Sequence, residues 1–596
     1  MKKYFKSFLF VLFFAFLFAS CDLLNFAGFY SENNSCQTLV TPTKSEIWNY
    51  NETYPIFKVD PDVASLKINN IPSNKQIFII TRNAGSTEIS RSATQNNKRL
   101  LFENELSDLI SEDFFSENEK FDCVLGPNLS SIKVEVKQNL SRTASSQDSS
   151  SNLSSPKEWQ IGDTKTIQFA SDKTGSYEYS QKNCTLKAIG QNCYFWIENS
   201  VFESGEVTTV HAEDYQQSFD EIYQMERFVF GKESDYLSTF ETCKDSTTNE
   251  YVPKRSPMSE YCDTGIFVNI VACKFPESYS NVVGFVFSAD YYYTNLDETD
   301  SLYQQYKEDF DLVKNSNHGK YFYINKDYIV KDSADIKSTL IHEFQHLINL
   351  NQKSGLGEKT QFNEMLSMLA EDMFAEFLYG ENYDETTISP FARIKTFLVN
   401  YFASGIIGWE SSDSRLSASY ANAYTFGSWI ARQYGGAALV KEISQNEYVN
   451  EESIVQAVNS VNGTNFTFED LFEQFLLAIM GNKNYTMNQN AAQKLTYSGN
   501  SYTYPMKALD IYGSLSDKVY AEFKYDSTSN FYKAKDENFN WKGPFVLSGK
   551  LKTICADNGI CITGSSLTNY LLSKNYSTYR LTSERYENEY YYFVIR

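Results

Sequence analysis

The sequence predicts an α+β fold in which a core of strands followed by helices lies between β-rich domains at both ends of the chain. Short apolar stretches separated by turn residues fill much of 46–140 and 158–330, a pattern typical of strands. From residue 335 onward the apolar residues recur at helical spacing. After about residue 497 the chain returns to alternating stretches rich in Tyr, Ser and Thr. Strands followed by packed helices are typical of the α+β class.

Composition limits the classes of protein to which this chain can belong. Its 596 residues include 53 Lys and Arg against 75 Asp and Glu, a formal net charge of −22. We expect several domains from this length, and no nucleic-acid partner, because phosphate contacts need clustered basic residues. The hydrophobic content of 42% excludes a wholly disordered chain.

The first 20 residues are predicted to be a signal peptide. A basic start, MKKYFK, precedes an uncharged apolar stretch over 8–18 that is too short to span a membrane. The ending FASC resembles a bacterial lipobox, although Leu usually stands at the position of Phe18. We therefore expect cleavage before Cys21 and acylation of that cysteine, which would anchor an extracytoplasmic protein to a bacterial membrane. The alternative is an ordinary secretory signal in which Cys21 is incidental.

Composition also divides the rest of the chain. The stretch 141–155 reads SRTASSQDSSSNLSS and cannot pack a core, so it marks a flexible linker. The expected units are the signal peptide (1–20), the lipidated cysteine with a polar tether (21–45), a β-rich N-terminal domain (46–140), the serine-rich linker (141–157), a central domain (158–495) and a β-rich C-terminal domain (496–596).

Within the central domain the pattern changes from strands to helices. Strands are expected at 165–170, 184–190, 193–199, 265–275, 281–293 and 319–330. Helices are expected at 212–227, 335–350, 361–379, 390–404, 418–434 and 467–481. Ser389-Pro390 is a predicted helix start, and Gly435-Gly436 is a predicted helix stop.

Nine cysteines follow Cys21. None forms a CxxC pair, so a thiolate zinc site is not expected. The close pairs Cys184/Cys193 and Cys555/Cys561 suit local hairpin disulfides in an oxidising compartment. Because nine is odd, at least one thiol stays free or pairs outside the chain.

One five-residue motif contains residues expected to bind a metal ion and to act in catalysis. Residues 342–346 read HEFQH within a stretch of helical apolar spacing. Residues four apart lie one turn apart on the same helix face, so His342 and His346 can bind one metal ion. Glu343 is placed to reach a metal-bound water and not the metal itself. Two imidazoles and a carboxylate with an open fourth position are the arrangement of a catalytic zinc, so we expect Zn²⁺ as the cofactor.

The third ligand is expected on the next predicted helix. Glu364 follows His346 by 18 residues, and side-by-side packing of the two helices would present it to the metal. Glu371, seven residues further on the same face, is the alternative ligand, or else a hydrogen-bond partner of a liganding histidine. The apolar residues around Glu364 leave little of this turn for water, which disfavours a merely solvated helix face.

Hydrolysis of an amide also needs a donor to the developing oxyanion. Tyr420 and Tyr424, one turn apart on a later predicted helix, are the candidates, and core packing is the competing interpretation for each. His211 and His318 are weaker candidates. Because His318 lies in the turn-like sequence NSNHGK, we expect it at the surface.

Four segments together resemble the hyicolysin family of secreted bacterial neutral zinc metallopeptidases. They read FDEIYQMERFVFG, NVVGFVFSADYY, IHEFQHLIN and FNEMLSMLAEDM, and the similarity extends over about 158–485. The resemblance implies a zincin-like core, with a small sheet, an active-site helix and a helical subdomain. It also implies His342, His346 and Glu364 as zinc ligands and Glu343 as catalytic base.

Two positions depart from the expected pattern. Met368 stands four residues after Glu364, where thermolysin-like enzymes place an Asp that supports a histidine. Phe362 replaces the family's usual Leu before Asn-Glu. The supporting carboxylate is therefore expected from Glu371 or Asp372.

These observations predict a membrane-anchored zinc endopeptidase that hydrolyses peptide bonds of extracytoplasmic proteins, with Glu343 activating the metal-bound water. The alternative is a non-enzymatic surface lipoprotein, an adhesin or structural module, that keeps the same core as a scaffold. The intact Glu343 disfavours this alternative, because a scaffold has no use for the base.

Overall fold

The computed structural model describes most of the chain beyond residue 37. The described residues are 38–72, 75, 77–90, 121–125, 157–173, 176–240, 254–329, 333–353, 356–383, 388, 390–411, 413–482, 484–485, 492–497, 500–507, 509, 511–512, 523–526, 531–534, 543–544, 553–564, 576–581 and 584–596. The predicted signal peptide, the predicted lipidation site Cys21, the strand-like stretch 131–138 and the linker up to residue 156 lie outside them.

The structure is α+β, as predicted, and at its centre is a seven-stranded mixed sheet with the order β7-β14-β16-β13-β10-β9-β8. The strands are β7 (Phe121–Leu125), β8 (Thr164–Lys173), β9 (Ser176–Ile189), β10 (Cys193–Glu198), β13 (Val268–Cys273), β14 (Val282–Phe287) and β16 (Lys320–Asn325). Strands β10, β13 and β16 run parallel, β14 is antiparallel to β16, and β7 is parallel to β14. Every residue of β13 and β16 is buried, which is why these stretches are apolar without alternation.

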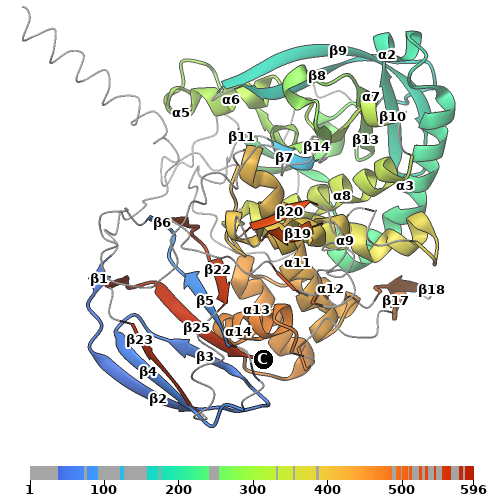
Figure 1. The fold of residues 1–596 in the computed structure, drawn as a ribbon. Coiled ribbons are helices and arrows are strands. Elements are labelled where there is room, and N and C mark those ends of the chain that lie inside the picture. The colour runs from blue at the N-terminus through green and yellow to red at the C-terminus, as the bar shows by residue number, and fades with distance from the viewer. Residues whose placement is uncertain are drawn as a thin grey trace, which may run out of the picture.

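Two long helices cover one face of this sheet. Helices α3 (Thr209–Phe230) and α8 (Ser333–Gln352) pack on each other, α3 against β9 and β10 and α8 against β14 and β16 (Figure 1). Their apolar residues join inward side chains of the strands, such as Phe195 and Phe322, in the main hydrophobic core. The opposite face is covered by a second core rich in aromatic rings, in which Trp159 packs edge-on against Trp196 at 4.9 Å.

A helical subdomain follows α8. It contains α9 (Thr360–Tyr379), α10 (Ala392–Asn400), α11 (Asp413–Tyr434), α12 (Ala437–Gln445), α13 (Asn450–Asn462) and α14 (Phe468–Ile479). Helix α9 packs along α8, and α11 packs on α9. The predicted helix stop is confirmed, because α11 ends before Gly435 and Gly436, whose positive φ angles of 144° and 60° favour glycine. Helices α12 and α13 were not among the predicted elements.

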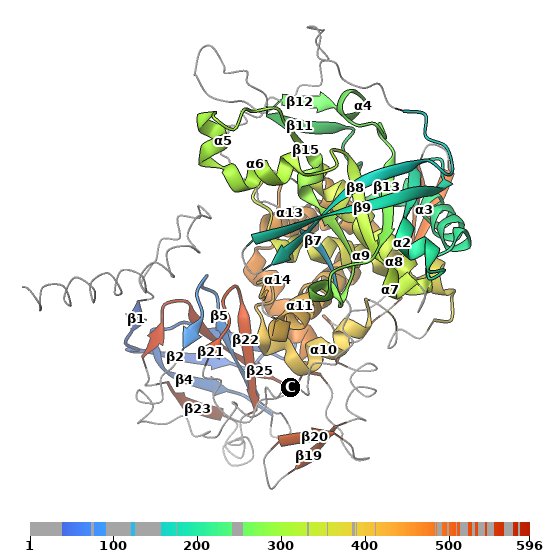
Figure 2. The same ribbon diagram turned by 90° about the horizontal axis from the view of Figure 1, so that it is seen from above.

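The two ends of the chain form one β unit, and not the two separate β-rich domains expected from the sequence. One sheet has the order β22-β5-β25-β3, and the other has the order β2-β4-β23. Their strands are β2 (Lys44–Asn49), β3 (Ile56–Val59), β4 (Val63–Asn69), β5 (Ile77–Asn83), β22 (Gly559–Gly564), β23 (Tyr576–Arg580) and β25 (Glu589–Ile595). Figures 1 and 2 both show the N-terminal blue strands beside the C-terminal red ones. Phe57, Leu66 and Phe593 share one core, which neither end supplies alone.

This β unit is joined to the helical subdomain. Ile80 and Tyr592 belong to the main hydrophobic core, and Arg82 forms an ion pair of 2.5 Å with Glu469 on α14.

The remaining elements are short: β1 (Leu39–Val40), β6 (Ile89–Ser90), α2 (Asn199–Glu203), β11 (Tyr236–Phe240), β12 (Lys254–Pro257), α4 (Met258–Tyr261), β15 (Tyr292–Thr294), α5 (Ser301–Gln305), α6 (Lys307–Lys314), α7 (Lys326–Ile329), β17 (Ala492–Tyr497), β18 (Asn500–Pro505), β19 (Phe523–Asp526), β20 (Phe531–Ala534), β21 (Thr553–Ile554), β24 (Arg585–Tyr586), and the 3-10 turns η4 (Glu277–Tyr279), η5 (Ser288–Tyr291) and η6 (Tyr401–Ala403).

The disulfides suggested by close cysteine spacing are absent from the described residues. Cys184, Cys193 and Cys555 are buried free thiols, so neither pair forms a disulfide, and Cys561 is also buried. Cys184 pairs with Glu198 across β9 and β10, five residues from Cys193, so the two cysteines lie about 16 Å apart along the strands. They also belong to cores on opposite faces of the sheet. Nearness in sequence therefore does not bring these thiols together.

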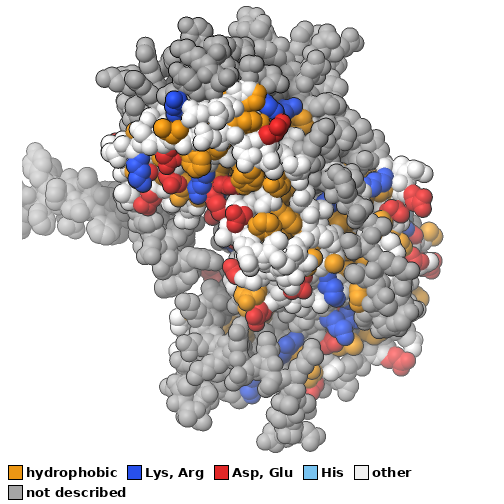
Figure 3. Space-filling view, turned by 90° about the horizontal axis from the view of Figure 1, so that it is seen from below, with side chains coloured by type: hydrophobic (Ala, Val, Ile, Leu, Met, Phe, Trp, Pro, Cys, Tyr) orange, Lys and Arg blue, Asp and Glu red, His pale blue; other side chains and the backbone are white. Residues whose placement is uncertain are grey.

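The surface of the described part is mixed in character. On the face drawn in Figure 3, Lys and Arg side chains are interspersed with Asp, Glu and apolar ones. The most exposed large apolar side chains, Ile47, Ile161 and Val210, stand on different parts of the chain. Of the described helices, none combines the length and the apolar character needed to cross a membrane.

Candidate metal centre

The HEFQH motif lies in the middle of α8, where the predicted helical pattern is confirmed. Apolar residues of this helix are fully buried against the sheet and the helical subdomain, namely Ile336, Leu340, Ile341, Phe344, Leu347 and Ile348. His342 and His346 stand one turn apart, with ring centroids separated by 4.7 Å. Both histidines are fully buried. The helix therefore holds two imidazoles side by side in the protein interior.

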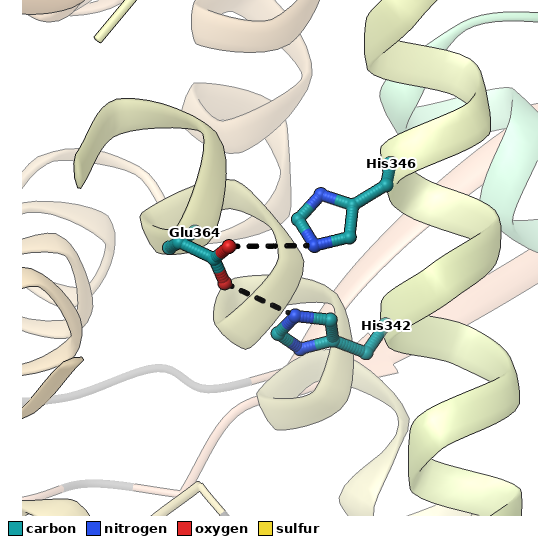
Figure 4. Close-up of side chains that lie close together, drawn as sticks. All are labelled: His342, His346 and Glu364. Carbon is teal, nitrogen blue, oxygen red and sulfur yellow. Dashed lines mark hydrogen bonds and ion pairs between the residues drawn. The ribbon is translucent and has the colours of Figure 1, made fainter. Parts of the chain in front are cut away.

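Glu364 reaches this pair from the facing helix α9. Its Oε2 lies 3.2 Å from His342 Nε2, and its Oε1 lies 3.7 Å from His346 Nε2. Figure 4 shows both rings pointing from α8 toward the one carboxylate on α9. The potential ligand atoms of the three residues all lie within 4.8 Å of one another. The structure thus brings together the three residues predicted as metal ligands.

The other ring nitrogen of His342 is bound by a second acid. His342 Nδ1 lies 2.8 Å from Glu371 Oε1, and Ser338 Oγ donates to Glu371 Oε2 at 2.7 Å. Nδ1–H is therefore the donor to the carboxylate, which leaves the Nε2 lone pair directed at Glu364. Glu371 takes the supporting role that the sequence assigned to it or to Asp372, and it is not part of the ligand group.

His346 is oriented by neutral groups. Its Nδ1 lies 2.9 Å from Asn363 Oδ1 and 3.0 Å from Ser367 Oγ. Asn349 Nδ2 also donates to Asn363 Oδ1 at 2.9 Å, so the amide oxygen is held as an acceptor. Nδ1 of His346 therefore carries the proton, and the Nε2 lone pair faces Glu364. Nε2 has no hydrogen-bond partner among the described residues.

This arrangement fits a cation at the centre of the three residues. Two nitrogen lone pairs that face carboxylate oxygens in a buried site repel them unless a proton or a cation lies between. In a tetrahedral zinc site with bonds of about 2.1 Å, ligand atoms stand about 3.4 Å apart. The observed separations of 3.2 and 3.7 Å lie on either side of that value. His342, His346 and Glu364 could therefore hold a zinc ion with little movement.

Glu343 lies on the side of α8 that faces the sheet. It is fully buried, and its Cγ lies 3.3 Å from the position that a Cβ on Gly284 would occupy. Gly284 belongs to β14, so the absence of a side chain there lets α8 approach the strand. The carboxylate group expected to act as a base therefore stands between the metal centre and β14.

None of the known family models matches this chain, and neither does any of the curated proteins compared with it.

Burial and charge set the protonation states around the centre. Burial raises the pKa of Glu364. Burial acts on Glu371 as well, but the hydrogen bond from His342, together with the charge of Arg393 and the hydrogen bond from Ser338, outweighs it and lowers the pKa. Burial, with the neighbouring His342, lowers the pKa of His346 well below its usual value. His346 is thus neutral, the form that binds metals.

Asp372 and Tyr424 serve the packing of α11 and not the ligand group. Asp372 accepts hydrogen bonds from Arg432 Nη1 at 2.7 Å and Nη2 at 2.8 Å, and from the Tyr424 hydroxyl at 3.0 Å. Tyr420 packs edge-on against Trp409 at 4.8 Å. The guanidinium of Arg393 lies 4.5 Å from the Tyr420 ring centroid. The Tyr424 hydroxyl is therefore directed to a buried ion pair.

The other two histidines are structural. His211 lies in the first turn of α3, where its Nδ1 accepts from the Thr208 backbone N–H at 3.1 Å. His318 is half-buried, and its Nδ1 lies 2.9 Å from the Tyr292 carbonyl oxygen. Its φ of 51° confirms the turn, but the expected surface position is wrong because the ring packs on Tyr293.

A second group of possible ligands, Glu88, Glu410 and Cys555, lies at the junction with the β unit. Arg415 Nη1 is 2.6 Å from Glu88, 3.6 Å from Glu410 and 3.8 Å from the Cys555 sulfur. A cationic side chain already stands among these groups, so they differ from the centre on α8.

The polar groups that orient the two histidines were not predicted from the sequence. Asn363 and Ser367 contact His346, and Ser338 supports the acid that contacts His342. Helical spacing was an available signal. Ser338 is four residues before His342, and Asn363 and Ser367 lie four apart on either side of Glu364, so all belong to turns that carry a ligand.

Proposed function

We propose that this protein is a zinc-dependent endopeptidase with a zincin-like core, related to the hyicolysin family and acting on extracytoplasmic proteins. The observation that carries the proposal is the convergence of His342 and His346 from α8 with Glu364 from α9, and Glu343 follows His342 on α8. Two imidazoles and one carboxylate leave a fourth position open, as in catalytic zinc sites. The lipobox-like FASC at Cys21 supports attachment to a bacterial membrane.

The residues around the centre have separable tasks in such a reaction. When bound, zinc lowers the pKa of a water molecule to about 7 and polarises the peptide carbonyl. Glu371 and Asn363 hold the two imidazoles in the tautomer whose Nε2 binds metal. Glu343 accepts the proton of the attacking water and passes it to the departing amine nitrogen. The packing of Glu343 against β14 supports a proton transfer on the strand side of α8.

The proposal is tested by hydrolysis of casein by the purified chain, with and without a chelator, together with zinc analysis. Glu343→Gln should keep one zinc per chain and lose activity by at least about a hundredfold. His346→Gln, the matched control, should lose both zinc and activity. An active Glu343→Gln protein, or a wild type indifferent to chelation, contradicts the assignment.

The alternative of a non-enzymatic surface lipoprotein makes the opposite prediction. In that case the wild type binds zinc at His342, His346 and Glu364 but hydrolyses neither casein nor short peptides. Glu343→Gln then has no measurable effect, because a scaffold does not use the carboxylate.

A further inference from the structure

The candidate centre is closed in this structure. His342, Glu343 and His346 are 0% exposed and Glu364 is 1% exposed. A peptide bond cannot reach these side chains unless a neighbouring element moves. Glu343 packs against β14, and the neighbour of β14 on its outer side is β7.

Strand β7 occupies the outer edge of β14. β14 pairs with β16 on one side and with β7 on the other, and β7 is the terminal strand of the seven-stranded sheet. Its register places Asp122 opposite Gly284 and Leu125 opposite Phe287. Because neighbouring strands lie about 4.8 Å apart, the β7 backbone runs one strand spacing beyond Gly284, the residue against which Glu343 packs. β7 also contacts α8 itself.

An extended substrate needs the same place. A bound peptide satisfies its backbone N–H and C=O groups by pairing with a sheet edge. The edge nearest Glu343 is that of β14, and its other side is already paired with β16. A substrate strand on β14 and β7 therefore exclude each other.

β7 is a short strand with long connections in sequence on both sides. Thirty residues (91–120) separate it from β6, and thirty-eight (126–163) separate it from β8. β7 has five residues and, among the described strands, pairs with β14 alone, so its departure breaks one short ladder of the described sheet.

We infer that residues 121–125 are an internal inhibitory strand that occupies the substrate edge of β14 and must be displaced before a peptide reaches Glu343. This inference rests on the proposed function. The segment preceding the central domain then regulates the enzyme, and the chain is made in a latent form.

The test disrupts the β7 pairing in the full chain. Asp122→Pro/Val124→Pro removes two backbone N–H groups and fixes φ at values poor for a strand. Ser149→Pro/Ser151→Pro, with the same spacing in the serine-rich segment, is the matched control. The β7 variant should hydrolyse casein at least about tenfold faster than the wild type, which corresponds to about 1.4 kcal/mol. The control should match the wild type. A synthetic peptide of residues 119–127 should inhibit the β7 variant competitively.

A binding experiment separates this inference from the proposed function. In the zinc-loaded Glu343→Gln background, a fluorescent 119–127 peptide should bind the β7 variant and not the unaltered strand or the linker control. If none of the proteins cleaves casein but this binding pattern is observed, the peptidase proposal fails. The inference that β7 occupies a peptide-binding edge of β14 is then still supported. If the peptide binds all proteins alike or none, or the β7 variant loses zinc and unfolds, β7 is a structural strand and the inference is overturned.

Discussion

Replacing Glu371 by Gln should weaken zinc binding without unfolding the protein. Glu371 joins His342 Nδ1 at 2.8 Å to Ser338 Oγ at 2.7 Å, and both of these groups are donors. A carboxylate accepts from both, whereas an amide turns its NH₂ toward one of them. Outer partners of liganding histidines contribute about 10- to 100-fold to metal affinity. We therefore expect zinc affinity to fall by that factor, or about 1.4 to 2.7 kcal/mol.

The next residue along α9 is the matched control. Asp372 is as deeply buried as Glu371, but it pairs with Arg432 and Tyr424 and not with a histidine. Asp372→Asn should lower the free energy of unfolding by about 3 to 5 kcal/mol, because Arg432 loses its buried partner. The folded fraction should bind zinc with nearly wild-type affinity.

The assay is zinc competition against a chromogenic chelator, combined with urea unfolding of the metal-free proteins. The expected result is a crossed pattern, in which one variant loses affinity and the other loses stability. Equal losses of zinc affinity in the two variants, or an unchanged affinity in Glu371→Gln, would show that the contact with His342 does not tune the site.

Three further outcomes are expected. Gly284→Ala should lower the free energy of unfolding by about 1 to 3 kcal/mol and reduce peptidase activity, because the new Cβ would stand 2.6 Å from Thr339 Cγ2 on α8; urea unfolding and casein hydrolysis measure both. Glu226 is fully buried, neither carboxyl oxygen has a hydrogen-bond partner among the described residues, and burial raises its pKa well above the usual value. The folded state then holds a proton that the unfolded chain releases above about pH 4.3, so stability falls by up to about 1.4 kcal/mol per pH unit above that value, and Glu226→Gln should remove this slope in urea unfolding at mildly acidic and neutral pH. Tyr424→Phe should cost about 1 kcal/mol of stability through the lost bond to Asp372 and leave kcat within about twofold, whereas a large loss of kcat in a folded variant would restore it as oxyanion donor.

The sequence alone predicted those features that depend on the residue pattern within a single helix or strand. The apolar spacing around 335–350 predicts α8, and the four-residue spacing of His342 and His346 then places both imidazoles on one face. These features follow from backbone geometry over a few turns, so they need no knowledge of the remaining chain. Glu364 is predicted on the following helix, but its meeting with the histidines depends on side-by-side packing of the two helices.

Tertiary packing decided the roles of individual side chains around the site and the pairing of distant strands. Glu371 and Asp372 are neighbours in sequence with equal claims to support a histidine, and only the placement of α8 on one side of α9 and α11 on the other separates their roles. The union of the two terminal β-rich segments in one unit is also a long-range result, because strand pairing depends on complementary faces and not on distance along the chain. The same holds for β7, which pairs with β14, a strand more than 150 residues later in the chain. The local sequence determines which secondary structure each segment forms. Which other segment packs against its apolar face depends on the fold of the whole chain.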